Sequence, residues 1–331
     1  MKAGETRLAK EYNETTRLPH RNGKDIARKI FDDDHALTKQ NASFTQASFD
    51  FQSVLCTPNS DVSLFYYKRK LNIYNFTVLN QQINDGHCFL WPEYEGRRGA
   101  SEIGTCLLKF LSTLPEATAD VALVCDSCSG QNKNSMIAAV IIHAVREITH
   151  LNSITVTYLE PGHTQMLVDN MHSRIEANRR FKKIYSYPEW FEICRKARKT
   201  DYIIHAMQHS DFCDLKSLSD GIGTSKHLQM SQVRVMQANK TESTETISVK
   251  YNYDDAGFTK IKLRPQRNSI STLRSLYSAQ LPISANKKND LLEMLASGAI
   301  PKEYRGFYED LPTDDGICDD IVLEDDDEEA F

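Results

Sequence analysis

The sequence predicts an α/β fold in which helices flank a mixed β-sheet. Residues 48–93 contain three β-type runs, and the turn Asn84-Asp85-Gly86 between two of them predicts a hairpin. Residues 101–184 then alternate between helical and strand patterns. The resulting order, β-β-β-α-β-α-β-α, combines three antiparallel strands with parallel ones and therefore indicates a mixed sheet.

Each element has its own signal. The strands are expected at 48–55, within 64–80, and at 87–93, 120–126 and 153–160. The first strand contains Asp50, and the fourth is a continuous apolar run typical of a strand buried on both faces. The helices are expected at 101–114, 134–148 and 165–184, where apolar residues recur at helical spacing. Ser101 is a suitable cap for the first of them.

The chain divides into four segments by composition. Residues 1–42 are polar, with a helix expected within 23–40. Residues 43–204 form the α/β domain. Residues 205–312 carry three alternating runs that predict a small antiparallel meander, followed by a helix at 289–300 that Gly298 ends. Residues 313–331 are an acidic tail, which we expect to be disordered.

Composition restricts the class of protein. The chain has 331 residues, of which 40% are hydrophobic, so it can bury a substantial core. Its longest apolar run falls short of the roughly 20 residues that a membrane span needs, and no secretory signal is visible at Met1. Eight cysteines in such a chain do not indicate a disulfide framework, so we expect an intracellular protein without membrane association.

The charge is unevenly distributed. The chain carries −5 in total, but residues 309–329 contain twelve acidic and no basic residues, so the rest carries +7. A basic body of this kind favours a polyanionic partner.

The stretch VCDSCSGQNKN, at 124–134, joins the predicted fourth strand to the next predicted helix and is rich in small polar side chains. Asp126 ends the predicted fourth strand, and ligands of open α/β sheets bind at strand ends. Asp169, His172 and Glu176 share one face of the last predicted helix. Together with Asp50, these residues could hold one or two divalent cations, and oxygen ligands favour Mg²⁺ or Mn²⁺. Two such ions would suit phosphodiester chemistry.

Simpler interpretations remain open for each residue. Asp50 could lie at the surface of an edge strand, and Asp126 could be stabilised by a helix dipole. The pair Cys125 and Cys128 could bind zinc with His163 and His172, or act as a redox pair, although one CxxC supplies only two of four zinc ligands. A structural role for both cysteines is the simplest reading.

A basic segment follows the candidate site. Residues 174–199 contain nine basic side chains interleaved with Tyr185, Tyr187 and Trp190, which is a composition that suits phosphate contact and base stacking. The predicted nucleic-acid-binding residues are Lys133, Arg174, Arg179, Arg180, Lys182, Lys183, Arg195 and Lys196. A solvated helix face is the alternative interpretation. Residues 195–199, RKARK, could also serve as a nuclear-import signal, which indicates a nuclear protein.

The strings CDSCSGQNKN (125–134) and EPGHTQMLVDNMHSRIE (160–176) carry a resemblance. They resemble an uncharacterised domain that is abundant in insect and other invertebrate proteomes and is itself similar to transposon-derived, RNase H-like transposases of the DDE type. The resemblance spans roughly residues 45–312. It implies an RNase H-like sheet with acidic residues on the first strand, the fourth strand and the last helix.

In this chain those acids are Asp50, Asp126 and either Asp169 or Glu176, with His172 nearby. The resemblance implies a metal-dependent nuclease or strand-transfer enzyme that uses two Mg²⁺ or Mn²⁺ ions on DNA, with a homo-oligomer as a further option. The alternative is a catalytically inactive, domesticated module on the same fold that binds DNA or protein.

Overall fold

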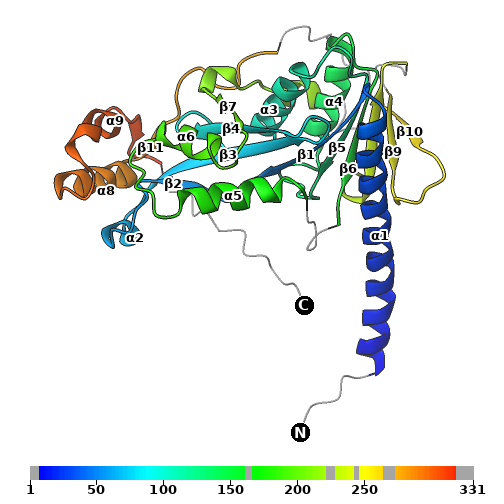
Figure 1. The fold of residues 1–331 in the computed structure, drawn as a ribbon, viewed down its shortest axis with the longest axis horizontal. Coiled ribbons are helices and arrows are strands. Elements are labelled where there is room, and N and C mark those ends of the chain that lie inside the picture. The colour runs from blue at the N-terminus through cyan, green and yellow to red at the C-terminus, as the bar shows by residue number, and fades with distance from the viewer. Residues whose placement is uncertain (1–6, 161–165, 221–227, 242–245, 264–272, 318–331) are drawn as a thin grey trace.

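A ten-stranded mixed sheet forms the centre of the protein, with helices on both faces (Figure 1). The structure is a computed structural model, and it describes residues 7–160, 166–220, 228–241, 246–263 and 273–317. The expected α/β class is therefore confirmed. Along the sheet the order is β10-β9-β8-β6-β5-β1-β3-β4-β7, and β2 pairs with β3.

The strands of this sheet are β1 (Phe44–Phe51), β2 (Leu55–Thr57), β3 (Leu71–Asn80), β4 (Asp85–Pro92), β5 (Asp120–Cys125), β6 (Ser153–Tyr158), β7 (Ile203–Ala206), β8 (Val235–Asn239), β9 (Thr246–Lys250) and β10 (Thr259–Lys262). Strands β1, β3 and β4 are antiparallel neighbours, whereas β5 and β6 run parallel to β1. A second sheet pairs β11 (Ile283–Ser284) with β12 (Thr313–Asp314).

The α-helices are α1 (Arg7–Gln40), α2 (Leu64–Tyr67), α3 (Ala100–Ser112), α4 (Ser135–Glu147), α5 (Asp169–Arg179), α6 (Glu189–Arg195), α7 (Lys216–Ser219), α8 (Ala285–Ala296) and α9 (Arg305–Glu309). Three 3₁₀ turns, at His209–Asp211, Met230–Gln232 and Lys302–Tyr304, complete the helical elements. Among the described residues, no helix combines the length and the apolar character needed to cross a membrane.

The side chains of β1 give the two faces of the sheet a different chemistry. Ala47, Phe49 and Phe51 point into the main apolar core, where α3 and α4 cover them. Gln46 and Asp50 point to the other face because side chains alternate along a strand. Figure 1 shows α3 and α4 on one side of the sheet and α5 on the other. Polar side chains of β1 therefore lie on the side that α5 covers.

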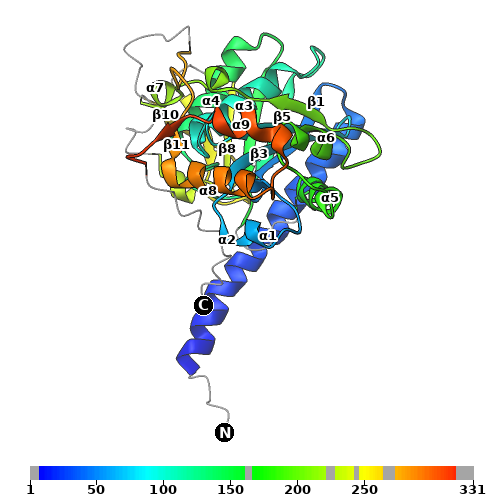
Figure 2. The same cartoon turned by 90° about the vertical axis from the view of Figure 1, so that its left-hand side faces the viewer.

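Helix α1 extends well beyond the body of the protein (Figures 1 and 2). It includes the helix expected within 23–40 and is longer than expected. Its C-terminal part packs on the sheet through buried Ala27 and Phe31, and Gln46 Nε2 donates to the Phe31 carbonyl at 3.0 Å. Figure 1 shows α8 and α9 grouped at the opposite end of the protein from α1, and in the end-on view of Figure 2 they lie in front.

Several predicted boundaries differ from the structure. The run 64–80 contains the short helix α2 before β3, and the helix expected at 165–184 is limited to α5. Ser101 does not cap α3, since Gly99 occupies the cap position and makes no side-chain hydrogen bond there. Gly298 does follow α8, and its φ of 79° lies in the left-handed region that glycine adopts readily.

The C-terminal elements continue the central sheet. The expected antiparallel meander corresponds to β8, β9 and β10, and β8 pairs antiparallel with β6. Of the twelve acidic residues at the C-terminal end, only Glu309, Asp310, Asp314 and Asp315 are described, because residues 318–331 lie outside the described part of the chain. The tail was expected to be disordered from residue 313, but Thr313–Asp314 form β12, and the rest of the prediction from residue 318 falls on residues outside the described part.

The contact between α3 and α4 offers a test of packing. A Cβ atom at Gly104 would meet the Leu215 side chain and lie 2.8 Å from Cγ2 of Val140. We expect Gly104→Ala to lower the free energy of unfolding by about 1–2 kcal/mol, because overpacking outweighs the better helix propensity of alanine. Urea unfolding measures the change.

Gly306 in α9 is the matched control, since a Cβ atom there would have no neighbour within 4 Å. Gly306→Ala should be neutral or slightly stabilising. Equal effects of the two substitutions would contradict the close packing of α3 on α4.

Candidate metal centre

Two acidic residues and a histidine form a group on the polar face of the sheet, and a third acid, Asp126, follows the neighbouring strand and lies outside that group. Asp50 lies in β1, Asp126 directly follows β5, and Asp169 and His172 belong to α5. One ligand atom each from Asp50, Asp169 and His172 lies within 4.8 Å of the other two. Within the described residues this is the one group of three or more potential metal ligands.

The register of β1 against β5 brings Asp126 to Asp50. Ser48 pairs with Val124 in this parallel ladder. Two residues further along each strand come Asp50 and Asp126, and a step of two keeps both side chains on one face. Neighbouring strands lie about 4.8 Å apart, so the two residues follow one another across the carboxyl ends of adjacent parallel strands, near enough for the charge of Asp126 to act on Asp50.

Helix α5 supplies the other two ligands because its apolar side is anchored in the protein. Met171 and Ile175 are buried in the second apolar core, which lies against β3 and β4. Asp169 and His172, three positions apart, therefore share a face. The backbone N–H of Met166 donates to Oδ2 of Asp169 at 2.8 Å, which fixes this carboxylate at the first turn of the helix.

Thr77 of β3 sets the orientation of the histidine ring. It pairs with Asp50 across the antiparallel ladder, and its hydroxyl donates to the Asp50 carbonyl at 3.1 Å. When the hydroxyl hydrogen points to the carbonyl, the hydroxyl at 2.7 Å accepts from Nε2 of His172, which corresponds to the tautomer with a free Nδ1 lone pair. Burial lowers the pKa of His172 to about 4, so near pH 7 the ring is neutral and Nδ1 keeps a lone pair for a cation.

The polar turn after β5 positions Asp126. Its Oδ1 accepts from the Cys128 backbone N–H at 3.2 Å and from Asn132 Nδ2 at 2.5 Å. Among the described residues no hydrogen bond reaches Oδ2, which leaves this oxygen for a ligand. Asn134 ends the turn by capping α4, since its Oδ1 accepts from the N–H groups of Met136 and Ile137 at 3.1 Å each.

Electrostatics favour a cation at this place. Burial and the neighbouring charges of Asp126 and Asp169 raise the pKa of Asp50 from 3.8 to about 7, although Arg98 acts in the opposite direction. Burial and Asp126 also raise the pKa of Asp169. Asn132 Oδ1 is buried beside Asp126 and has no hydrogen-bond partner in the described chain. Clustered carboxylates that repel one another fit a divalent cation with oxygen ligands.

Glu176 is not part of this group. Its Oε1 accepts from Gln52 Nε2 at 3.0 Å, and its Oε2 is bonded to Nε of Arg179. Both carboxylate oxygens are thus engaged one turn further along α5. The structure therefore groups Asp169, and not Glu176, with Asp50 and His172.

The cysteines lie beside the centre without joining it. Cys125 is fully buried, and burial raises the pKa of its thiol well above the usual range, which disfavours the thiolate that zinc or redox chemistry requires. Cys128 is partly buried. Neither belongs to a group of three metal-ligating side chains among the described residues, and His163 lies outside them.

The predicted nucleic-acid-binding residues fall into two sets. Lys133 is buried and donates to the Ser231 carbonyl at 2.8 Å, so it supports the interior and does not present its charge to a phosphate. The exposed members are Arg174, Arg180, Lys182, Lys183, Arg195 and Lys196. Arg179 is half-buried and pairs with Glu176, whereas Arg195 pairs with Glu192 and Lys196 with Asp201, both at 2.8–2.9 Å.

The aromatic side chains expected to stack on bases are mostly structural. Trp190 is fully buried and donates to Thr57 Oγ1 at 2.9 Å. Tyr187 is buried and donates to the Leu90 carbonyl at 2.7 Å. Tyr185 is partly buried and packs against the Tyr304 ring. The prediction that Tyr187 and Trp190 stack on bases is therefore wrong.

Two residues near the centre carry no signal in the sequence. Thr77 orients His172, and Gln52 bridges Glu176 to Asn75 through its amide, whose Oε1 accepts from Asn75 Nδ2 at 2.8 Å. Thr77 lies within an ordinary strand pattern, and Gln52 directly follows a strand, so neither position stands out in the sequence. Their closeness to α5 becomes visible only when β1 pairs with β3.

The fold and this centre define an α/β protein with an acidic and histidine cluster suited to a divalent cation. Residues 69–255, more than half of the chain, match the model of a domain of unknown function, DUF7869, and the chain belongs to this family. Asp126, Asp169 and His172 lie within the matched region, and Asp50 lies before it. Comparisons with curated proteins and with solved structures found no match.

The buried charge of Asp50 predicts a stability profile. Because its pKa in the folded chain is about 7, against an ordinary value of 3.8, folding takes up a proton between these pH values and stability falls as pH rises through them. In EDTA at pH 8, Asp50→Asn should raise the free energy of unfolding by on the order of 2–4 kcal/mol. Below about pH 4 the difference should disappear.

Chemical unfolding at several pH values measures this profile. Asp211→Asn is the matched control with the opposite sign, because Asp211 forms a 2.8 Å ion pair with Lys109 and should lose stability at neutral pH. If Asp50→Asn destabilises the protein at pH 8, the carboxylates do not form a repulsive cluster.

Proposed function

We propose that this chain is an RNase H-like phosphodiester enzyme of the DDE type, which cuts or joins DNA with Mg²⁺ or Mn²⁺ held by Asp50, Asp126 and Asp169. The observation that carries the proposal is the group of Asp50, Asp169 and His172, from β1 and α5, beside which Asp126 at the end of β5 acts electrostatically on both acids. A transposon-derived origin, as the sequence resemblance implies, belongs to the same proposal.

The strand order supports this choice of fold. Within the large sheet, β4-β3-β1-β5-β6 places three antiparallel strands beside two that run parallel to β1. Helices α3, α4 and α5 follow β4, β5 and β6 in the chain. This order supports the RNase H-like core that the sequence resemblance implies, in which acids are expected on the first strand, the fourth strand and the last helix.

The donor set fits a hard divalent cation. Carboxylates and one neutral imidazole are suitable ligands for Mg²⁺ or Mn²⁺, and Mn²⁺ tolerates the nitrogen better. Asp50, Asp126 and Asp169 would hold the ion, with His172 Nδ1 available beside them. When bound, the cation would stabilise the negative charge that develops on a reacting phosphodiester.

The surrounding residues prepare the ligands. The Thr77 hydroxyl fixes the orientation of the His172 ring, and burial keeps the ring neutral near pH 7. Asn132 and the Cys128 N–H hold Oδ1 of Asp126, which restrains the carboxylate and leaves Oδ2 for a ligand. Such hydrogen bonds to ligands commonly change metal affinity or activity 10–100-fold when removed. The turn CDSCSGQNKN is therefore a support for Asp126.

Cleavage of end-labelled duplex DNA tests the proposal. With Mg²⁺ or Mn²⁺ we expect nicking by the wild-type protein, a loss of about 100-fold or more in Asp126→Asn, and a loss of about 10–100-fold in Asn132→Ala. EDTA should abolish the activity of the wild type.

Asp120→Asn is the matched control. Asp120 begins the same strand, β5, and its Oδ1 accepts from Ser153 Oγ at 2.6 Å at the end remote from the centre. This variant should cleave DNA like the wild type. Equal activity of the wild type and Asp126→Asn would contradict the metal centre. DNA binding that persists in EDTA would then favour the catalytically inactive binding module.

A further inference from the structure

A second, separate site lies at the C-terminal end of α5. A pocket of about 220 Å³ opens there between residues 59–61 and residues 179–182. Two backbone hydrogen bonds tie these segments together, since Asn59 and Ile184 exchange N–H···O bonds of 2.8 and 2.9 Å. The pocket is therefore a defined feature of the fold, although its walls come from distant parts of the chain.

Phe181 is the unusual residue of this pocket. Its side chain is 83% exposed, and its φ of 68° lies in a region that bulky residues rarely adopt. The Arg180 guanidinium lies 5.1 Å from the centre of its ring. A large aromatic ring held in solvent by a strained backbone indicates a binding role, because it contributes nothing to the core.

The charge around Phe181 is positive. Arg180, Lys182 and Lys183 are exposed, and neither Arg180 nor Lys183 forms an ion pair with any residue that the structure describes. Lys182 donates to Asn178 Oδ1 at 2.9 Å. Asp61 is the one acid that lines the pocket itself. The complementary ligand is therefore a polyanion with an apolar or aromatic part.

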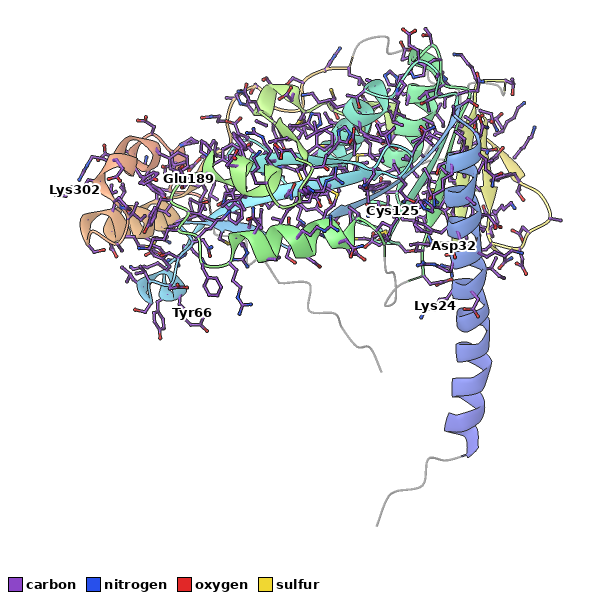
Figure 3. The ribbon with its side chains drawn as sticks, in the orientation of Figure 1. Lys24, Asp32, Tyr66, Cys125, Glu189 and Lys302 are labelled. Carbon is purple, nitrogen blue, oxygen red and sulfur yellow. The ribbon has the colours of Figure 1, made fainter. Side chains whose placement is uncertain are left out.

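Further aromatic side chains follow the other wall of the pocket. Tyr66 and Tyr67 of α2 are 84% and 80% exposed, and Tyr66 comes five residues after Asp61, a span of at most about 18 Å. With Phe181 they are the most exposed large apolar side chains in the described chain. Figure 3 shows Tyr66 projecting outward from α2, and Cys125, next to Asp126, near the opposite end of α5.

Helix α5 connects the pocket with the candidate metal centre. Asp169 begins the helix and Phe181 follows its end, so the two are separated by about 18 Å along the axis. Between them, the solvent side of the helix presents Asn170, Ser173, Arg174 and Ala177. This side is open and carries one basic group, so a strand of nucleic acid can follow it.

We propose that this pocket binds an unpaired nucleotide of single-stranded DNA, with its base stacked on Phe181 and its phosphates held by Arg180, Lys182 and Lys183. The charge and the exposed aromatic rings of the pocket indicate a polyanionic ligand with bases. That this ligand is the substrate strand of the enzyme rests on the proposed function. A duplex hides the faces of its bases, whereas an exposed ring stacks on an unpaired base. Tyr66 and Tyr67 extend the contact to neighbouring nucleotides.

Fluorescence anisotropy with a labelled single-stranded oligonucleotide, in EDTA, tests this site. Phe181→Ala should weaken binding about 5- to 150-fold, which corresponds to the loss of one stacked base. Phe181→Asn, which tolerates a positive φ, should weaken it similarly and excludes a backbone effect. An oligonucleotide with abasic positions should bind the wild type less tightly, and Phe181→Ala should no longer distinguish it from the normal strand.

Charge is tested by the dependence on salt. Arg180→Gln and Lys183→Gln should each reduce the slope of log K against log salt concentration by about 0.7. Lys39→Gln is the matched charge control, since Lys39 is exposed on α1. Ile83→Ala is the matched apolar control, since Ile83 is 52% exposed in the turn between β3 and β4. Both controls should bind like the wild type.

The outcome separates this site from the metal centre. If single-strand binding needs Phe181 but the protein does not cleave DNA, the nucleotide-binding pocket is supported and the proposed enzyme activity is contradicted. If cleavage depends on Asp126 but Phe181→Ala and Phe181→Asn bind single strands like the wild type, only the nucleotide-binding role of the pocket is contradicted. Absence of single-strand binding by the wild type, or loss of self-association rather than of DNA binding in the variants, also overturns the pocket assignment.

Discussion

The parallel pairing of β1 with β5 is the constraint on which the candidate site depends. Its register sets Ser48 against Val124, so Asp50 and Asp126 arrive together at the carboxyl ends of neighbouring strands. A slip of one residue would turn Asp50 into the apolar core beside Phe49. The buried Ala47, Phe49 and Phe51 on the opposite face make such a slip costly, so the packing of the core also determines the geometry of the acids.

The same arrangement carries an energetic cost. Asp50 and Asp169 are partly buried and their carboxylates are disfavoured by Asp126, with Asp50 reaching a pKa of about 7. Nothing in folding alone requires three acids at one sheet edge, and local instability of this kind is typical of functional sites. His172, which is fixed by Thr77 and kept neutral by burial, completes the group with Asp50 and Asp169.

Much of the fold follows from local patterns in the sequence. The hairpin, the buried strand β5 and the alternation of helices and strands were predictable, because periodicity and turn residues act locally. Of the expected site residues, Asp50, Asp169 and His172 lie together, and Asp126 follows the strand next to Asp50. The stacking role of Trp190 was wrong because its indole packs into a core built from α6, α8 and β3, which no local pattern reveals. The exposed Phe181 was missed for the same reason, as only the tertiary structure shows that nothing covers it.

Glu176 shows the limit of helical spacing. Residues 169, 172 and 176 share a face of α5, yet only the first two reach Asp50, because Arg179 and Gln52 occupy the glutamate. A crystal structure of the protein with Mn²⁺, read by anomalous scattering, tests the metal centre most directly. We expect an anomalous peak within coordination distance of Asp50, Asp126 and Asp169. A peak at Cys125 and Cys128, or no peak at saturating Mn²⁺, would contradict the centre.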